Sequence, residues 1–340
     1  MKNSIEINCG IVGADLDRVR QLVGVRELNN EAAWLLCDFL NDNPKAVSAD
    51  LVREVGCDGL AEQTTVAALV AGFCGLDAEL ERKDALMFDF YIRRAVRKLD
   101  VDDYLNNPYY RNIKIPDAKV GDWSLEHDSY AAYEIFLCDD LMLCDDFREI
   151  PQLGFFDRPF SFPVVKEGGR EWMAIKPSEI ESMRSPVGQV AGRVAVLGLG
   201  LGYFAYMASL KVDVEQVTIV ERDERVVELF EKYILPQFEF ARKIRLLKID
   251  AFDFVSDGMD DGEFDYVFVD LWHDASDGLP MYLKMKALEA GFAKTKFLYW
   301  VENTLQSAWR WNVFEDVLKN ATCYDDVVRI LKSGVCACKR

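Results

Sequence analysis

A short stretch in the second half of the chain, VAVLGLGLGY at 194–203, constrains the fold more than any other feature. Branched apolar residues typical of a buried strand lead directly into Gly198, Gly200 and Gly202, and the helix-like run FAYMASL follows. Glycines between a strand and a helix permit a tight turn and let the backbone approach a ligand closely. The stretch therefore predicts the nucleotide-binding turn of an α/β protein.

Strand-like and helix-like segments alternate through the rest of the chain from residue 187 onward. Runs rich in Val, Ile and Leu predict strands at 194–199, 216–221, 243–249, 265–270 and 297–302. Helix-like runs separate these strands, which is typical of a doubly wound, mostly parallel sheet. We therefore expect 187–340 to be a Rossmann-like domain, with a helix at 306–320 near its end.

The first part of the chain has a different pattern of apolar residues. Apolar residues at helical spacing predict helices at 31–40, 64–73 and 82–99, so 1–103 is expected to be a helical domain. Such a domain could bind a partner, form a homodimer or act as a lid, and the sequence leaves these alternatives open.

Residues 104–186 are expected to form a β-rich connector. Two strand-like runs flank the turn-forming sequence EGGR at 167–170, which predicts a hairpin. Ser178, with Glu181 three residues later, predicts a capping box at the start of a helix.

Composition excludes several classes of protein. The net charge of −18 argues against a protein that binds nucleic acid by neutralising phosphates. Nine cysteines without a CxxC pair suggest reduced thiols in the cytoplasm, and two histidines are too few for a histidine-rich metal site. The N-terminus lacks the features of a signal peptide, and the uncharged run 194–210 is interpreted as a strand and a helix rather than a membrane span.

Three predicted strands end in carboxylates. Glu221 follows the second strand, Asp250 the third and Asp270 the fourth. The carboxyl ends of parallel strands share one edge of the sheet, and ligands bind at that edge in open α/β folds. Glu221 lies about twenty residues beyond the glycines, where a carboxylate accepts hydrogen bonds from ribose hydroxyls in nucleotide sites.

These motifs carry a resemblance to a known superfamily. Residues 194–303 resemble the S-adenosylmethionine-binding domain of class I methyltransferases and are most similar to the spermidine synthase (aminopropyltransferase) branch. The resemblance rests on VAVLGLGLG, TIVERDERVVELFEKYILPQ, IRLLKIDAFDFV and FDYVFVD. It implies S-adenosylmethionine, or its decarboxylated form, as the cofactor, and it does not extend to the N-terminal half.

The resemblance also implies roles for individual residues. The glycine turn would pass beneath the amino-acid end of the cofactor, Glu221 would hold the ribose and Asp250 the adenine amino group. Asp270 would face the reacting centre and take a proton from an attacking amine. The implied cofactor site comprises Gly198, Leu199, Gly200, Gly202, Tyr203, Glu221, Arg222, Asp250, Ala251 and Asp270.

Residues after the fourth strand complete the expected site. His273 is a second candidate for the general base, although it could instead hydrogen-bond a loop carbonyl beside Trp272. Trp272 and Asp274 are expected to contact the substrate. The chain departs from the synthases at Leu201 and His273, where they carry aspartates, and this favours methyl transfer over aminopropyl transfer.

The substrate is expected to be a small cationic or amine-bearing molecule, because no Lys or Arg occurs between Ile249 and Leu283. The leading interpretation is a methyltransferase, with an aminopropyltransferase as the alternative in the same fold. The sequence GLGYFA at 200–205 also satisfies a dinucleotide fingerprint, so an NAD-dependent oxidoreductase stays open. A further alternative is a non-catalytic protein that binds nucleosides and has a regulatory role.

Overall fold

The computed structural model describes residues 7, 10–56 and 59–333, and these divide into two compact units. Unit 1 takes its described residues from Met1–Arg97, Asp140–Gly154 and Asn303–Arg340, and unit 2 consists of Lys98–Asp139 and Phe155–Glu302. This division differs from the three consecutive segments expected from the sequence, because the last helices of the chain belong to the same unit as the first.

A five-stranded parallel sheet forms the centre of unit 2. Its strands are β8 (Gly192–Leu197), β9 (Val214–Val220), β10 (Ile244–Leu247), β11 (Tyr266–Val269) and β12 (Lys296–Tyr299). Their order is β10-β9-β8-β11-β12, so successive connections run to opposite sides of β8. The expectation of a mixed α/β fold with a parallel sheet is confirmed, and this order is compatible with a Rossmann-like fold.

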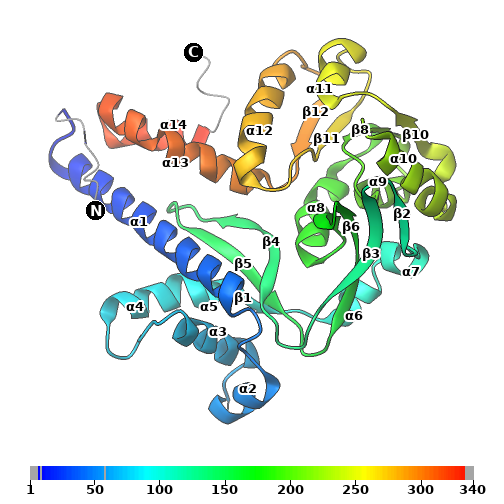
Figure 1. Ribbon diagram of the computed structural model, residues 1–340. Coiled ribbons are helices and arrows are strands. Elements are labelled where there is room, and N and C mark those ends of the chain that lie inside the picture. Colours follow the sequence, from blue (N-terminus) through cyan, green and yellow to red (C-terminus); the bar gives the residue numbers. More distant parts are fainter. Residues whose placement is uncertain (1–6, 8–9, 57–58, 334–340) are drawn as a thin grey trace. The chain divides into compact units, whose positions relative to one another are not determined.

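Helices connect these strands, as the sequence predicts (Figure 1). They are α9 (Tyr203–Ser209), α10 (Glu224–Leu229), α11 (Ala251–Asp253) and α12 (Ala275–Glu289), with irregular turns at η2 (Phe230–Ile234), η3 (Leu235–Gln237), η4 (Ala241–Lys243) and η5 (Phe254–Gly258). The single helix expected after Glu221 is α-helical only to Leu229 and continues as π and 3₁₀ turns. Pro236 lacks the N–H that a continuing helix would need.

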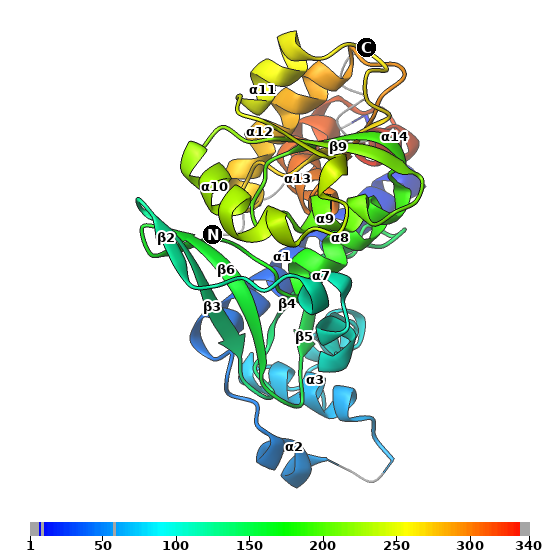
Figure 2. The same ribbon diagram turned by 90° about the vertical axis from the view of Figure 1, so that its right-hand side faces the viewer.

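A four-stranded antiparallel sheet also belongs to unit 2. Its order is β2-β3-β6-β7, with β2 (Ala118–Val120), β3 (Trp123–Tyr130), β6 (Phe160–Glu167) and β7 (Arg170–Ala174). Figure 2 shows β3 and β6 as its long central pair. Gly168 and Gly169 turn the β6–β7 hairpin with φ of +56° and +84°, so the predicted hairpin is present.

Three helices precede the parallel sheet in unit 2, namely α6 (Val101–Leu105), α7 (Pro108–Asn112) and α8 (Pro177–Gln189). The predicted capping box at Ser178 and Glu181 is wrong. Lys176 is the N-cap of α8, no side chain caps the helix, and Pro177 occupies its first turn. Proline suits this position because its fixed φ matches the helix and its missing N–H would have no intrahelical partner.

Unit 1 is mainly helical. Its helices are α1 (Gly13–Asp42), α2 (Ala49–Val55), α3 (Glu62–Phe73), α4 (Arg82–Met87), the π turn η1 (Phe88–Ile92) and α5 (Arg93–Ala95), followed late in the chain by α13 (Glu302–Asn320) and α14 (Tyr324–Ser333). The helices predicted at 31–40 and 64–73 lie within α1 and α3. The helix predicted at 82–99 ends at Ala95, because the following residues form β1 (Val96–Lys98).

The strand β1 belongs to a three-stranded sheet with the order β1-β5-β4, where β4 is Phe136–Leu143 and β5 is Glu149–Phe155. An apolar core in unit 1 joins residues far apart in sequence, among them Val19 and Leu22 of α1, Phe314 and Leu318 of α13, and Leu331 of α14. None of the helices in the described part of the chain is long and apolar enough to cross a membrane.

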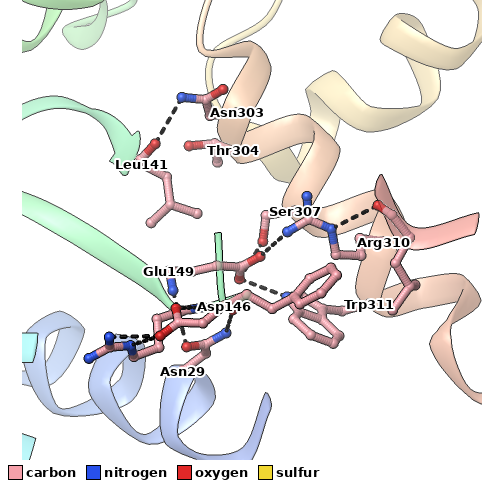
Figure 3. Close-up of polar contacts among 12 residues, drawn as sticks. Asn29, Leu141, Asp146, Glu149, Asn303, Thr304, Ser307, Arg310 and Trp311 are labelled. Atoms are coloured by element: carbon pink, nitrogen blue, oxygen red, sulfur yellow. Dashed lines mark hydrogen bonds and ion pairs between the residues drawn. The ribbon is translucent and has the colours of Figure 1, made fainter. Parts of the chain in front are cut away.

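A buried polar cluster in unit 1 accompanies this core (Figure 3). Glu149 of β5 forms an ion pair with Arg310 of α13 at 3.0 Å. Its carboxylate also accepts hydrogen bonds of 2.7 Å from Ser307 Oγ and from Trp311 Nε1. Asn29 of α1 accepts a 3.1 Å hydrogen bond from the Glu149 backbone N–H. The cluster thus joins the three sequence segments that make up unit 1.

Candidate functional site

A cavity of about 220 Å³ lies in unit 2, lined by residues that follow the parallel strands and by residues of β7 and α8. Its lining includes Glu171, Trp172, Met173, Lys176, Glu179, Gly198, Leu199, Gly200, Glu221, Arg222, Asp250, Ala251, Phe252, Asp270, Trp272, His273, Met281 and Trp300. Most residues of the predicted site therefore meet at one cavity. Gly202, Tyr203 and Asp274 do not line it.

The glycine turn follows β8 and packs closely on the end of β11. Gly198 has φ of +98°, and a Cβ at this position would lie 2.0 Å from the backbone oxygen of Asp270. A side chain at position 198 is therefore excluded by both conformation and space. Further along the turn, Gly202 packs against Phe230, and the Tyr203 hydroxyl accepts a 2.9 Å hydrogen bond from Asn107.

Glu221 links the glycine turn to the next loop. Its carboxylate accepts hydrogen bonds from the backbone N–H of Leu199 at 3.3 Å and of Asp223 at 2.8 Å. Burial raises the pKa of Glu221, and these hydrogen bonds partly oppose the rise. A carboxylate offers about four acceptor positions, so the backbone N–H groups of Leu199, Asp223 and Arg222 leave room for a hydroxyl group of a ligand in the cavity.

Asp250 caps the short helix α11. Its Oδ1 atom accepts a 2.8 Å hydrogen bond from the Phe252 backbone N–H, and its Oδ2 atom lies 3.3 Å from Nη1 of Arg222. Both oxygens therefore have local partners. A ligand amino group that reached Asp250 would have to share them with the helix cap and with Arg222.

Asp270 and Glu179 are the unusual pair of the cavity. Asp270 directly follows β11, and Glu179 projects from α8 with a relative exposure of 6%. Among the residues that the structure describes, neither carboxylate accepts a hydrogen bond or forms an ion pair. Burial raises the pKa of Asp270 to about 7. Burial, followed by repulsion from Asp270, raises the pKa of Glu179, and Lys176 opposes this rise.

Sequence reasoning missed Glu179, since it assigned this segment only to the start of a helix. A signal was present, because Glu179 and Met183 are four residues apart and share one helix face. Met183 and Ile180 are buried, so a carboxylate on that face is itself buried. A charged residue among the apolar positions of a short helix next to a glycine turn would have indicated a site residue.

Carboxyl groups outnumber cationic groups in the cavity. Its lining has five carboxylates and two cationic side chains. Lys176 is paired with Glu171, whose Oε1 atom lies 2.5 Å from Nζ, and Arg222 is paired with Asp250. The electrostatic potential of such a cavity favours cationic ligands.

His273 has a local partner on β7. Its Nε2 atom lies 3.2 Å from the backbone oxygen of Glu171, and its ring packs edge-on against Trp172 at 4.2 Å between centroids. The hydrogen bond to a carbonyl oxygen requires a proton on Nε2, which leaves Nδ1 as the basic nitrogen of the neutral ring. The structure thus shows His273 hydrogen-bonded to a backbone carbonyl, which is the alternative role expected for it.

Trp272 and Asp274 flank His273 and differ in their surroundings. Trp272 lines the cavity, is 5% exposed, and its indole N–H has no hydrogen-bond partner among the described residues. Asp274 lies outside the cavity lining, and its carboxylate caps α12 by accepting a 2.7 Å hydrogen bond from the Ser276 N–H. The structure thus gives Asp274 a capping contact in place of the expected contact with substrate.

Comparison with known proteins gives limited information. No protein-family model and no curated protein matches the chain. Among solved structures, a conserved hypothetical protein from Streptococcus pyogenes matches with 22% identity over 32% of this chain and 64% of its own, at a TM-score of 0.27. A probable spermidine synthase from Corynebacterium glutamicum matches with 18% identity over 33% of this chain and 44% of its own, at a TM-score of 0.27. The chain thus spans less than two thirds of either neighbour, and its chemistry must be argued from its own cavity.

Proposed function

We propose that the protein is a transferase that binds S-adenosylmethionine in the cavity of unit 2 and methylates an amine-bearing small molecule. The observation that carries this proposal is the pair formed by the buried Glu179 and the half-buried Asp270, which both lack hydrogen bonds and ion pairs among the described residues. Buried carboxylates without protein partners are costly, and a cationic ligand would supply the missing partner. Their place beside the glycine turn and Glu221 favours a ligand that combines a nucleoside with positive charge.

The residues present fit such a cofactor. Glu221 would hold a ribose hydroxyl with its remaining acceptor position, and Gly198 and Gly200 would leave room for the amino-acid end. Asp250 and Ala251 would contact the adenine base of the cofactor, and Asp250 would keep its ion pair with Arg222. When bound, the cofactor supplies an electrophilic methyl group on a positively charged sulfur.

Asp270 is the residue we assign to proton transfer. An amine attacks only in its neutral form, so the acceptor has to lose a proton. A carboxyl group whose pKa is about 7 can accept that proton near neutral pH, because its basicity matches the working range. Glu179 would stabilise the ammonium form of the acceptor on arrival, and His273, held on the Glu171 carbonyl, would keep the loop after β11 in place.

Isothermal titration of S-adenosylmethionine and of NADH into the purified protein tests the proposal. We expect S-adenosylmethionine to bind and E221A to weaken that binding at least about tenfold, because ribose contacts are lost. D270N should retain binding and lower turnover by about 10²-fold or more. E228A, on the exposed face of α10, is the matched control and should change neither. Binding of NADH without S-adenosylmethionine would instead support an oxidoreductase.

Aminopropyl transfer is the second candidate, and Glu179 specifically favours it. Position 201 in the glycine turn is a buried leucine, and neither it nor any other residue of the turn supplies a carboxylate to the cavity. Glu179 of α8 contributes a carboxylate to the same cavity, and this carboxylate could bind the ammonium group of a decarboxylated cofactor. Mass spectrometry of reactions with putrescine separates the candidates, since decarboxylated cofactor would then yield spermidine and the carboxylated form would yield a methylated amine.

A further inference from the structure

The backbone N–H groups of the glycine turn have unequal partners. Oxygen atoms accept hydrogen bonds from most of them: Gly198 N–H binds Val220 O at 2.9 Å, Leu199 N–H binds Glu221 at 3.3 Å and Gly202 N–H binds Leu199 O at 2.8 Å. Leu201 N–H instead donates to the thioether sulfur of Met173 at 3.2 Å. A thioether is a weak acceptor, so this N–H would gain from a better partner.

Met173 reaches the turn from β7 and lies against Gly200. A Cβ at position 200 would be 2.5 Å from the Met173 sulfur, so the glycine allows this close approach. Met173 lines the main cavity and also a second cavity of about 10 Å³ bordered by Met183 and Phe268. Its unbranched side chain can change rotamer at low cost. Met173 thus contacts both the Leu201 N–H and the cavity, and a change of its rotamer would move the thioether away from that N–H.

The backbone geometry around the Leu201 N–H favours an anionic partner. Gly200 has φ of +50°, and successive N–H groups in such a turn form a concavity that binds anions. A carboxylate on a donor's tail would find Leu201 N–H a stronger partner than the sulfur provides. Glu179 and Asp270 nearby would repel the same carboxylate and attract an ammonium.

We propose that Met173 sets the affinity of the site for carboxylated donor tails, because its thioether holds the Leu201 N–H and a carboxylated tail, including that of S-adenosylmethionine, has to displace it. A nucleoside whose tail lacks a carboxylate binds with Met173 in place, whereas a carboxylated tail has to displace it. Met173 is thus a specificity-determining residue. This inference rests on the proposed nucleoside donor site and adds the property that selects the donor's tail.

Titration calorimetry with two stable probes tests the inference. S-adenosylhomocysteine carries the tail carboxylate, and 5′-methylthioadenosine lacks the amino-acid tail. M173L keeps an apolar side chain of similar volume but removes the sulfur acceptor. We expect it to tighten S-adenosylhomocysteine binding about three- to tenfold and to leave 5′-methylthioadenosine binding unchanged. M281L, which changes another methionine of the cavity lining, should leave the ratio of the two affinities unchanged.

The outcomes separate this inference from the proposed function. Binding of both probes with the same affinity ratio in M173L and wild type would overturn the role of Met173 and leave the nucleoside site standing. Absence of binding of either probe to the wild type would overturn the proposed function itself. Hydrogen exchange of the Leu201 amide gives a readout without ligand. We expect faster exchange in M173L than in M281L, and equal exchange would overturn the role of Met173.

Discussion

Two glutamates in the two units are equally buried but differ in their partners. Glu149 in unit 1 and Glu179 in unit 2 are each 6% exposed, and burial raises the pKa of both. Glu149 has an ion pair with Arg310 and two side-chain hydrogen bonds. Glu179 has neither among the described residues. A buried charge whose partners are all supplied by the protein belongs to the structure, whereas one without partners indicates a ligand.

The cost of burial explains why this difference is informative. Removing a carboxylate from water is unfavourable, and hydrogen bonds and opposite charges have to offset the loss of hydration. Glu149 meets this requirement within unit 1. Glu179 and Asp270 have neither a hydrogen bond nor an ion pair among the described residues, and only the more distant charge of Lys176 opposes the rise in the pKa of Glu179. The folded protein therefore carries an unfavourable interaction that binding of a cation would relieve. The following experiments test this contrast, from the largest expected effect to the smallest.

Removing the cation beside Glu149 should have the largest effect on stability. R310M keeps the apolar part of the side chain but leaves a buried carboxylate without its counter-charge. We expect the free energy of unfolding to fall by about 3–5 kcal/mol, as measured by urea denaturation. R329M on α14 removes a mostly exposed ion pair with Asp326 and serves as the control. A loss below about 1 kcal/mol in R310M would show that Glu149 is not a structural charge.

Asp270 has no counter-charge such as Arg310 provides for Glu149, and the pH dependence of the free energy of unfolding should reveal this difference. Its pKa is about 7 in the folded protein and near 3.9 when unfolded, so the folded state binds more protons between these values. The free energy of unfolding should therefore fall as the pH rises from 4 to 7, by up to about 4 kcal/mol, and then level off. D270N has no carboxyl group to titrate at this position. The difference in the free energy of unfolding between D270N and the wild type should therefore change steadily over that pH range. Equal pH profiles would rule out a raised pKa of Asp270 in the folded protein.

Removing a hydrogen bond that holds the glycine turn should have a smaller effect on stability. Tyr109 is buried, and its hydroxyl donates a 2.5 Å hydrogen bond to the backbone oxygen of Leu201. Y109F removes this bond, and we expect a loss of stability of about 1 kcal/mol with weaker nucleoside binding. Calorimetry of the variant checks both quantities. Y324F, whose ring packs on Arg18 in unit 1, is a comparison variant that should not change nucleoside binding.

The sequence predicts the local parts of the cavity well. The strands are recognisable because branched apolar runs alternate with helices, and the glycine turn with Glu221 and Asp270 follows from strand ends in one sheet. Contacts between distant segments could not be predicted in this way. Glu179 and Met173 reach the cavity only through the placement of α8 and β7 beside the glycine turn.

The organisation of unit 1 shows the same limit. The pairing of α1 with α13 and α14 depends on an apolar core shared by residues about 300 positions apart, such as Val19 and Leu318. A helical period predicts which residues of α1 are buried, but it contains no information on what covers them. The error at Ser178 has a local cause, since Pro177 begins α8 and leaves Ser178 within the first turn.

A matched pair of variants, E179Q and E149Q, tests the central claim most directly. Each replaces one buried carboxylate with a neutral amide of nearly the same shape, and titration calorimetry with S-adenosylmethionine gives the readout. We expect E179Q to weaken binding at least about tenfold, because the positive charge of the ligand loses its partner, and E149Q to bind like the wild type. If E179Q bound S-adenosylmethionine as tightly as the wild type, the unpaired carboxylate would not be a ligand-binding group.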